Sequence, residues 1–258
     1  MYDSAIKENF INTQPFQHYP ADSFPMVYPI HWLTSHFAVG GWSPLQRLSG
    51  MLTAHMTTIA PRNGFTWHPH RGVEIYTWVL DGTLSHEDTT GGKGDITAGE
   101  LQRMFSGDWI EHQELNHQDE PARVIQIWYA ADPKHMGLEP HYQQANKDDL
   151  PTKKLGDATL FGLIGEDSPM QQHMTGRLTA TSIPAGGETN IEPPRGDEDL
   201  FLYVTDGSGR AKHNGHAPVL AQYDVILANA EVGETSMLAA DDSGLDYLSF
   251  YLPKFIEQ

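Results

Sequence analysis

Short runs of β-branched and aromatic residues, each closed by a turn signal, recur along the whole chain. The run at 73–80, VEIYTWVL, ends at Asp81-Gly82, and the run at 124–130, VIQIWYA, has the same character. Comparable runs in the second half lie at 177–183, 200–205, 223–227 and 245–252. A spacing of roughly 8–12 residues between turn signals is typical of a β-sandwich or barrel. The pattern therefore predicts an all-β protein.

A faint internal repeat runs through these strands. The segment 73–84, VEIYTWVLDGTL, aligns with 199–209, DLFLYVTDGSG, and each is an apolar run closed by Asp-Gly. Asp81 and Asp206 share the same ungapped offset of 125 residues as Pro69 and Pro194. Two copies of one β-module are the economical interpretation.

The two halves differ in composition. Of the 14 histidines, 11 precede residue 142, and so do all 6 tryptophans. The segment 132–151 is polar, contains three prolines and shows no strand alternation, which is typical of a domain boundary. We expect an N-terminal domain at 1–133 that carries the chemistry, a linker at 134–150 and a C-terminal domain at 151–258.

Charge and composition exclude several classes of protein. The net charge is −18, with 34 acidic against 16 basic residues, which argues against direct binding to nucleic acid. No apolar stretch approaches the ~18–20 residues of a membrane span, and residues 1–10, MYDSAIKENF, lack the pattern of a signal peptide. The chain has no cysteine, which excludes disulfides and thiolate sites. We therefore expect a cytoplasmic protein that does not bind membranes.

Two short segments carry candidate metal ligands. In 67–74, WHPHRGVE, His68, His70 and Glu74 have the same parity, so an extended chain would place them on one face. In 109–115, WIEHQEL, the same alternate spacing relates His112 and Glu114. A neighbouring strand could present this pair to the first histidines. Three imidazoles and a carboxylate suit one divalent transition metal, and the residue pattern leaves both glutamates open as the carboxylate ligand.

The segment HPHRGVEIYTWVLDGTLSHEDTTGGKGDITAGELQRMFSGDWIEHQE is similar to the pirin family of the cupin superfamily. The resemblance implies a bicupin, two stacked jelly-roll β-barrel domains. It also implies His68, His70, His112 and Glu114 as metal ligands, whereas the general cupin pattern would use Glu74. We prefer Glu114 and expect Glu74 to be a base or a hydrogen-bond partner. Pro193 and Arg195 occupy the positions aligned with His68 and His70, so we expect no metal in the C-terminal domain.

The resemblance further implies a metal-dependent dioxygenase. It would open the ring of a flavonol such as quercetin with O2 and release CO, with Glu114, or else Glu74, as general base. We expect Fe(II) first, with Ni, Cu, Mn, Zn or Co as alternatives. The small aromatic substrate would lie against a wall of apolar side chains: Phe65, Trp67, Trp78, Met104 and Phe105. The alternative is a non-catalytic, metal-bound regulatory protein that binds a protein partner. His86 is interpreted as a strand-edge hydrogen-bonding residue.

Overall fold

The computed structural model describes residues 15–254. The segment 1–10, for which the sequence predicts no signal peptide, lies outside the described residues. Between residues 15 and 254 the chain forms β-strands and three short 3-10 helices, and every pairing of these strands is antiparallel. The predicted all-β class is confirmed, with open sheets in place of closed barrels. No helix among the described residues is long and apolar enough to cross a membrane.

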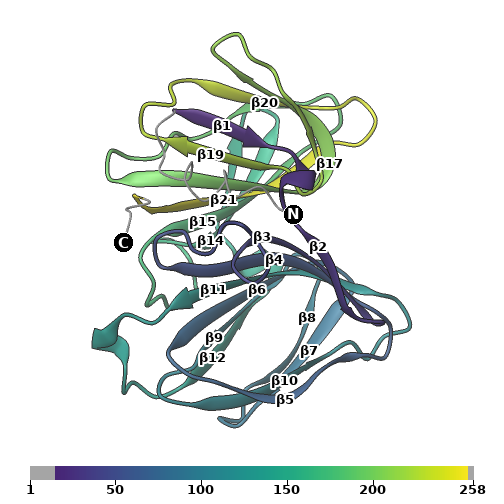
Figure 1. The fold of residues 1–258 in the computed structure, drawn as a ribbon, viewed down its shortest axis with the longest axis vertical. Helices are drawn as coiled ribbons and strands as arrows, with labels where there is room; N and C mark the ends of the chain where they lie inside the picture. Colours follow the sequence, from purple (N-terminus) through teal and green to yellow (C-terminus); the bar gives the residue numbers. More distant parts are fainter. Residues whose placement is uncertain (1–14, 255–258) are drawn as a thin grey trace. The chain divides into compact units, whose positions relative to one another are not determined.

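The chain divides into two compact units. The first module comprises residues 25–150 and 169–174, and the second comprises the remaining described residues. Two segments differ from the sequence-based division. β1 (Phe16–Tyr19) belongs to the second module because it pairs with β19 (Val225–Asn229). The expected linker contains β12 (His141–Ala145), which pairs with β9 (Leu101–Phe105) in the first module. Figure 1 shows β1, in purple, beside β19.

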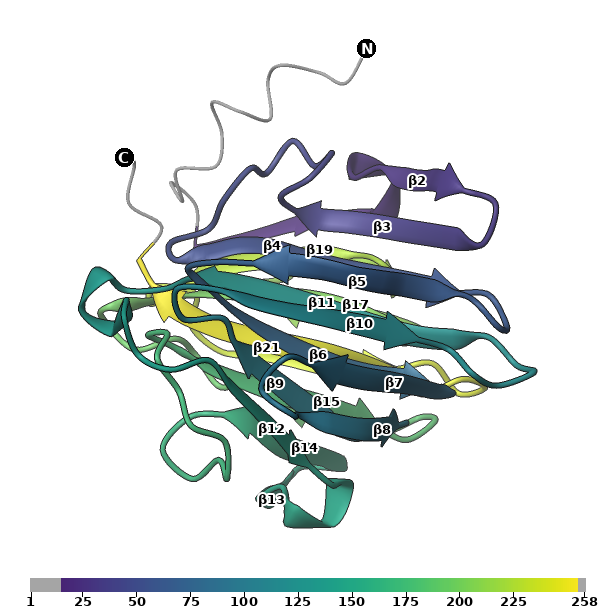
Figure 2. The same cartoon turned by 90° about the horizontal axis from the view of Figure 1, so that it is seen from below.

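The first module is built from two sheets. The seven-stranded sheet has the order β12-β9-β6-β11-β4-β3-β2. The four-stranded sheet has the order β5-β10-β7-β8, and Figure 2 shows these four strands side by side. The remaining elements are β2 (Met26–Ile30), β3 (Leu33–Val39), β4 (Met51–Ile59), β5 (Gly64–His70), β6 (Val73–Asp81), β7 (Thr83–Asp88), β8 (Lys93–Thr97), β10 (Ile110–Leu115), β11 (Ala122–Ala130), η2 (Pro133–His135) and η3 (Lys147–Asp149).

Aliphatic side chains from both sheets of the first module pack into one core. Ile59, Val79 and Val124 come from the seven-stranded sheet, and Leu84 and Ile96 come from the four-stranded sheet. The two sheets therefore face each other as a sandwich. Because side chains alternate along a strand, this core fixes which residues of each strand point inward.

The second module has a ten-stranded sheet system centred on one long strand, β17 (Glu198–His213). Pro193, aligned by the repeat with His68, lines an apolar hollow with Leu200 and Ile226. The other elements are η1 (Ala21–Ser23), β13 (Thr152–Leu155), β14 (Ala158–Ile164), β15 (Arg177–Ile183), β16 (Glu188–Asn190), β18 (Val219–Ala221), β20 (Thr235–Ala239) and β21 (Leu245–Pro253).

Candidate metal centre

Two neighbouring strands of the four-stranded sheet carry the predicted histidines. β5 and β10 are antiparallel, and His112 is the register partner of His68. The next register pair is Glu114 with Phe65, so three steps along β5 match two steps along β10. This β-bulge adds one residue to β5. It explains why Phe65 packs against the inter-sheet core although its parity is opposite to that of His68.

Three imidazoles converge between the sheets. The ring centroids of His68 and His112 lie 4.4 Å apart, those of His70 and His112 4.8 Å apart, and those of His68 and His70 4.9 Å apart. One nitrogen from each ring lies within 4.8 Å of the other two. The Nε2 atoms of His70 and His112 are buried and have no hydrogen-bond partner among the described residues. Because buried polar atoms are normally paired, this donor set fits a nitrogen-coordinated metal ion.

Two of these imidazoles, His70 and His112, are uncharged at neutral pH. Burial, together with His112 and His68, lowers the pKa of His70 to about 4, although Glu114 acts in the opposite direction. Burial, followed by His68 and His86, lowers the pKa of His112 to about 3. Metal binding needs this neutral form.

His68 is oriented by its own strand. Its Nδ1 lies 2.7 Å from the carbonyl oxygen of Thr66, and a carbonyl can only accept a hydrogen bond. Nδ1 therefore donates, and the lone pair of the neutral ring is left on Nε2.

Glu114 lies two residues beyond His112 on β10, and its side chain is buried. Its Oε1 accepts a hydrogen bond from Gln102 of β9, and its Oε2 accepts one from Gln126 of β11. Gln102 also donates to the hydroxyl of Thr77, at 3.1 Å. Among the described residues, Glu114 falls into a second group of possible ligands, with His86 and His112, whose donor atoms are mutually within 4.8 Å. Its role as a ligand stays a prediction.

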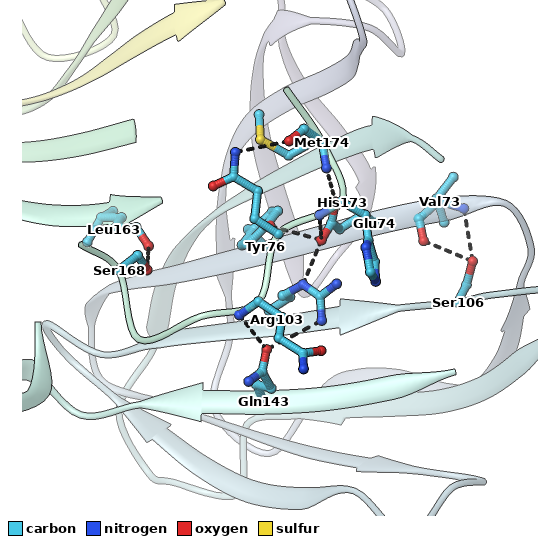
Figure 3. Close-up of polar contacts among 12 residues, drawn as sticks. Val73, Glu74, Tyr76, Arg103, Ser106, Gln143, Leu163, Ser168, His173 and Met174 are labelled. Carbon is cyan, nitrogen blue, oxygen red and sulfur yellow. Dashed lines mark hydrogen bonds and ion pairs between the residues drawn. The ribbon is translucent and has the colours of Figure 1, made fainter. Parts of the chain in front are cut away.

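Glu74 lies elsewhere. Its Oε1 accepts from Arg103 Nε at 2.6 Å and from the Tyr76 hydroxyl at 3.0 Å, and its Oε2 accepts from the backbone N–H of Met174 at 2.7 Å (Figure 3). The adjacent Ile75 instead packs against Ile110 of the four-stranded sheet, so Glu74 is on the opposite face.

The shared face expected for Glu74 and the two histidines is therefore not found. Parity holds only within one strand, and β5 ends at His70. Gly72, with a φ of 64°, lies in the turn before β6 begins at Val73. This turn resets the alternation. Glu74 pairs with Arg103 instead of facing the imidazoles.

The five residues predicted to form the apolar wall of the substrate site separate into three groups. Phe65 and Met104 pack in the inter-sheet interior. Trp67 is 47% exposed and so does not line that interior. Trp78 has the parity of Glu74 on β6, and Phe105 contacts Arg103 and His173, so both lie on the other face of the seven-stranded sheet.

Sequence reasoning missed three side chains at this centre, Trp128, Asp88 and Gln126, and it expected only a strand-edge hydrogen bond from His86. The ring planes of Trp128 and His70 are perpendicular, and their ring centroids lie 4.9 Å apart. The buried Nε1 of Trp128 has no hydrogen-bond partner among the described residues. The sequence did offer a signal for Trp128, because it lies four residues after Val124 in the run 124–130 and an even spacing puts both side chains on one face of a strand. His86 and Asp88 are fully buried beside His112, and Gln126 reaches Glu114 from the facing sheet.

Sequence comparison relates the chain to a known family. The Pirin family model matches residues 43–129. A pirin-like protein of Caulobacter vibrioides is 44% identical over 159 residues, which are 61% of this chain and 66% of that protein. A pirin-like protein of Solanum lycopersicum is 28% identical over 74% of this chain and 67% of its own. A Mycobacterium bovis protein provisionally named quercetin 2,3-dioxygenase is 40% identical over 44% of this chain and 46% of its own. The chain thus spans between about half and two thirds of these relatives.

Solved structures share the fold. The bacterial pirin YhhW of Escherichia coli, in complex with nickel(II), has a TM-score of 0.75 at 24% identity, covering 92% of this chain and 99% of its own. A quercetin 2,3-dioxygenase from Acinetobacter baumannii has a TM-score of 0.75 at 20% identity, covering 96% and 81%. The family model spans both histidine strands, and together with the pirin-like relatives it establishes that the chain belongs to the pirin family.

Proposed function

We propose that the protein is a metal-dependent dioxygenase of the pirin type that opens the ring of a flavonol such as quercetin with O2 and releases CO. The observation that carries the proposal is the convergence of three imidazoles, two of them with buried Nε2 atoms that have no hydrogen-bond partner in the part of the chain that the structure describes. Pirin relatives named for quercetin dioxygenase activity support the choice of substrate class.

We assign the metal to His68, His70 and His112, with Glu114 as the carboxylate ligand. When bound, a divalent transition metal would supply Lewis acidity and a template that orients an oxygen-bearing substrate. Nitrogen and carboxylate donors suit several divalent transition metals, of which we expect Fe(II) first, with Ni, Cu, Mn, Zn or Co as alternatives. The nickel(II) in the E. coli pirin is consistent with such a donor set.

The surroundings match a flat substrate with both a hydroxyl and a carbonyl group. Gln102 Oε1 is a buried acceptor and the Nε1–H of Trp128 a buried donor, and neither has a hydrogen-bond partner among the residues described. Substrate polar groups would satisfy both. Phe65 and Met104 supply apolar surface between the sheets. A pocket that is largely apolar, with a few fixed polar groups, is typical of small-molecule sites.

Glu114 is the acid–base group of this proposal. The amide donors of Gln102 and Gln126 hold its two carboxylate oxygens in place between the sheets. A carboxylate in this position can take the hydroxyl proton of the substrate. Glu74 is not assigned this role, because it lies on the face of β6 opposite to the imidazoles and pairs there with Arg103.

The test is O2-dependent turnover. Purified protein loaded with Fe(II) or Ni(II) is mixed with quercetin, and the loss of flavonol absorbance is followed with CO detection. We expect His70→Ala to abolish CO release and His117→Ala, at an exposed position, to retain it. An equally slow loss of flavonol absorbance in the wild type and in His70→Ala would indicate autoxidation of the flavonol and would contradict the proposal. Tight metal binding without turnover of any aromatic hydroxyl compound would favour the non-catalytic regulatory alternative.

A further inference from the structure

A buried chain of hydrogen bonds leads away from the proposed metal position. His86 and Asp88 lie on one face of β7, and both side chains have 0% exposure. Asp88 Oδ2 lies 3.0 Å from His86 Nε2, and His86 Nδ1 lies 3.4 Å from His112 Nδ1. Tyr142 stacks on His86, with ring centroids 4.4 Å apart and an interplanar angle of 14°. The His86 ring is thus held from three sides.

The acceptor end of this chain is fixed by the turn after β7. Asp88 Oδ1 accepts from Thr90 N at 2.7 Å, from Thr90 Oγ1 at 2.6 Å and from Gly92 N at 3.0 Å. Burial favours the neutral acid, but the hydrogen bonds from His86, Thr90 and Gly92 outweigh it and lower the pKa of Asp88. A Cβ on Gly92 would lie 2.3 Å from Asp88 Oδ2, so this close approach requires glycine.

The positions of the hydrogens along this hydrogen-bond chain follow from the ionised carboxylate of Asp88. An ionised carboxylate only accepts, so His86 Nε2 must carry a hydrogen. The Nδ1 of a neutral His86 is then an acceptor, and the facing His112 Nδ1 must carry a hydrogen. The remaining lone pair of His112 is on Nε2, the buried atom that has no hydrogen-bond partner within residues 15–254.

We propose that Asp88 and His86 are positioning residues that fix the hydrogen of His112 on Nδ1 and so present its Nε2 lone pair to the metal. The inference rests on the metal site of the proposed function. Hydrogen bonds of this kind hold a ligand ring in one tautomer and orientation, and their loss typically costs about 10–100-fold in metal affinity.

A competing arrangement would place a second ion among His86, His112 and Glu114, whose donor atoms also lie within 4.8 Å of one another. The hydrogen bonding favours the positioning role. The two Nδ1 atoms face each other as donor and acceptor, and Asp88 occupies the other nitrogen of His86. The positioning role predicts one ion per chain.

The isosteric variant Asp88→Asn gives a sharp test. The three donors around Oδ1 keep an oxygen there, so the new NH2 group would face His86 Nε2. His86 would then donate from Nδ1, His112 would accept at Nδ1, and the hydrogen on His112 Nε2 would block the metal. The matched control is Asp95→Asn on neighbouring β8. The exposed carboxylate of Asp95 accepts a hydrogen bond from Ser85 and takes no part in the hydrogen-bond chain of Asp88, His86 and His112.

We expect the Zn²⁺ dissociation constant to rise about 10–100-fold in Asp88→Asn and to stay unchanged in Asp95→Asn. Long-range ¹H–¹⁵N NMR of the zinc-loaded wild type should show hydrogens on His112 Nδ1 and His86 Nε2. Either ring in the opposite tautomer, two zinc ions per chain, or an unchanged dissociation constant in folded Asp88→Asn would overturn the inference. If Asp88→Asn does not fold, the wild-type spectrum decides alone.

These readouts are independent of turnover. The predicted tautomers in a wild type that does not degrade quercetin would remove the dioxygenase proposal and leave the positioning role. Quercetin turnover with the opposite tautomers would do the reverse.

Discussion

His68 and His112 are direct register partners across β5 and β10, and their ring centroids lie 4.4 Å apart. The backbone ladder of these two strands therefore brings the imidazoles together, whereas a loop would hold them less precisely. His70 joins them because it lies two residues beyond His68 on the same strand. The metal position is thus a product of strand pairing and alternation.

Replacement of Glu114 by glutamine tests the carboxylate ligand. Glu114→Gln keeps the shape but removes the charge between Gln102 and Gln126. We expect metal affinity, measured by competition with a chromogenic chelator, to fall by about 10-fold or more. Glu111→Gln, on the same strand but of opposite parity, is the control and should bind like wild type. Equal affinities in all three proteins would exclude Glu114 as a ligand.

Acid should destabilise the metal-free protein. An unfolded histidine takes up a proton near pH 6.5, whereas folded His70 does so at a pKa of about 4 and His112 at about 3. Between these values the unfolded state binds more protons, so the free energy of unfolding rises with pH. This stability is complete above pH 6.5 and is lost as the pH falls toward about 4.

Urea unfolding of the metal-free protein at pH 7 and pH 5 measures this effect. We expect a lower free energy of unfolding at pH 5, with a smaller difference in His112→Gln and an unchanged difference in His117→Gln. A wild type that is equally stable at both values would contradict the neutral state of the buried rings.

Arg103 should matter for stability and not for metal binding. Its pairing with Glu74 is fully buried, and the loss of one partner of such a pair typically costs about 3–5 kcal/mol. We expect Arg103→Met to lower the free energy of unfolding by this amount, while Arg62→Met, which removes an exposed ion pair, costs less than about 1 kcal/mol. Folded Arg103→Met should bind metal with wild-type affinity. Weaker binding would show that Glu74 and the metal position are coupled.

Local patterns predicted what lies within single strands. His68 and His70 share a face because both lie inside β5, as do His112 and Glu114 inside β10. Glu74 could not be placed in this way, since the turn that ends β5 at His70 is a boundary that parity cannot cross. The all-β class followed from the same short-range alternation.

Contacts between residues far apart in the chain could not be predicted from the sequence patterns. Gln126 meets Glu114 only because two sheets face each other, and His86 meets His112 only because β7 pairs with β10. The pairing of β1 with β19 joins residues about 200 positions apart, and nothing in either segment signals it. These contacts depend on the packed fold.

Anomalous diffraction from crystals of the nickel- or zinc-loaded protein tests the central claim most directly. A single strong peak about 2.0–2.2 Å from the Nε2 atoms of His68, His70 and His112 is the expected result. A peak at other residues, or no peak in crystals grown with saturating metal, would contradict the assignment of this centre.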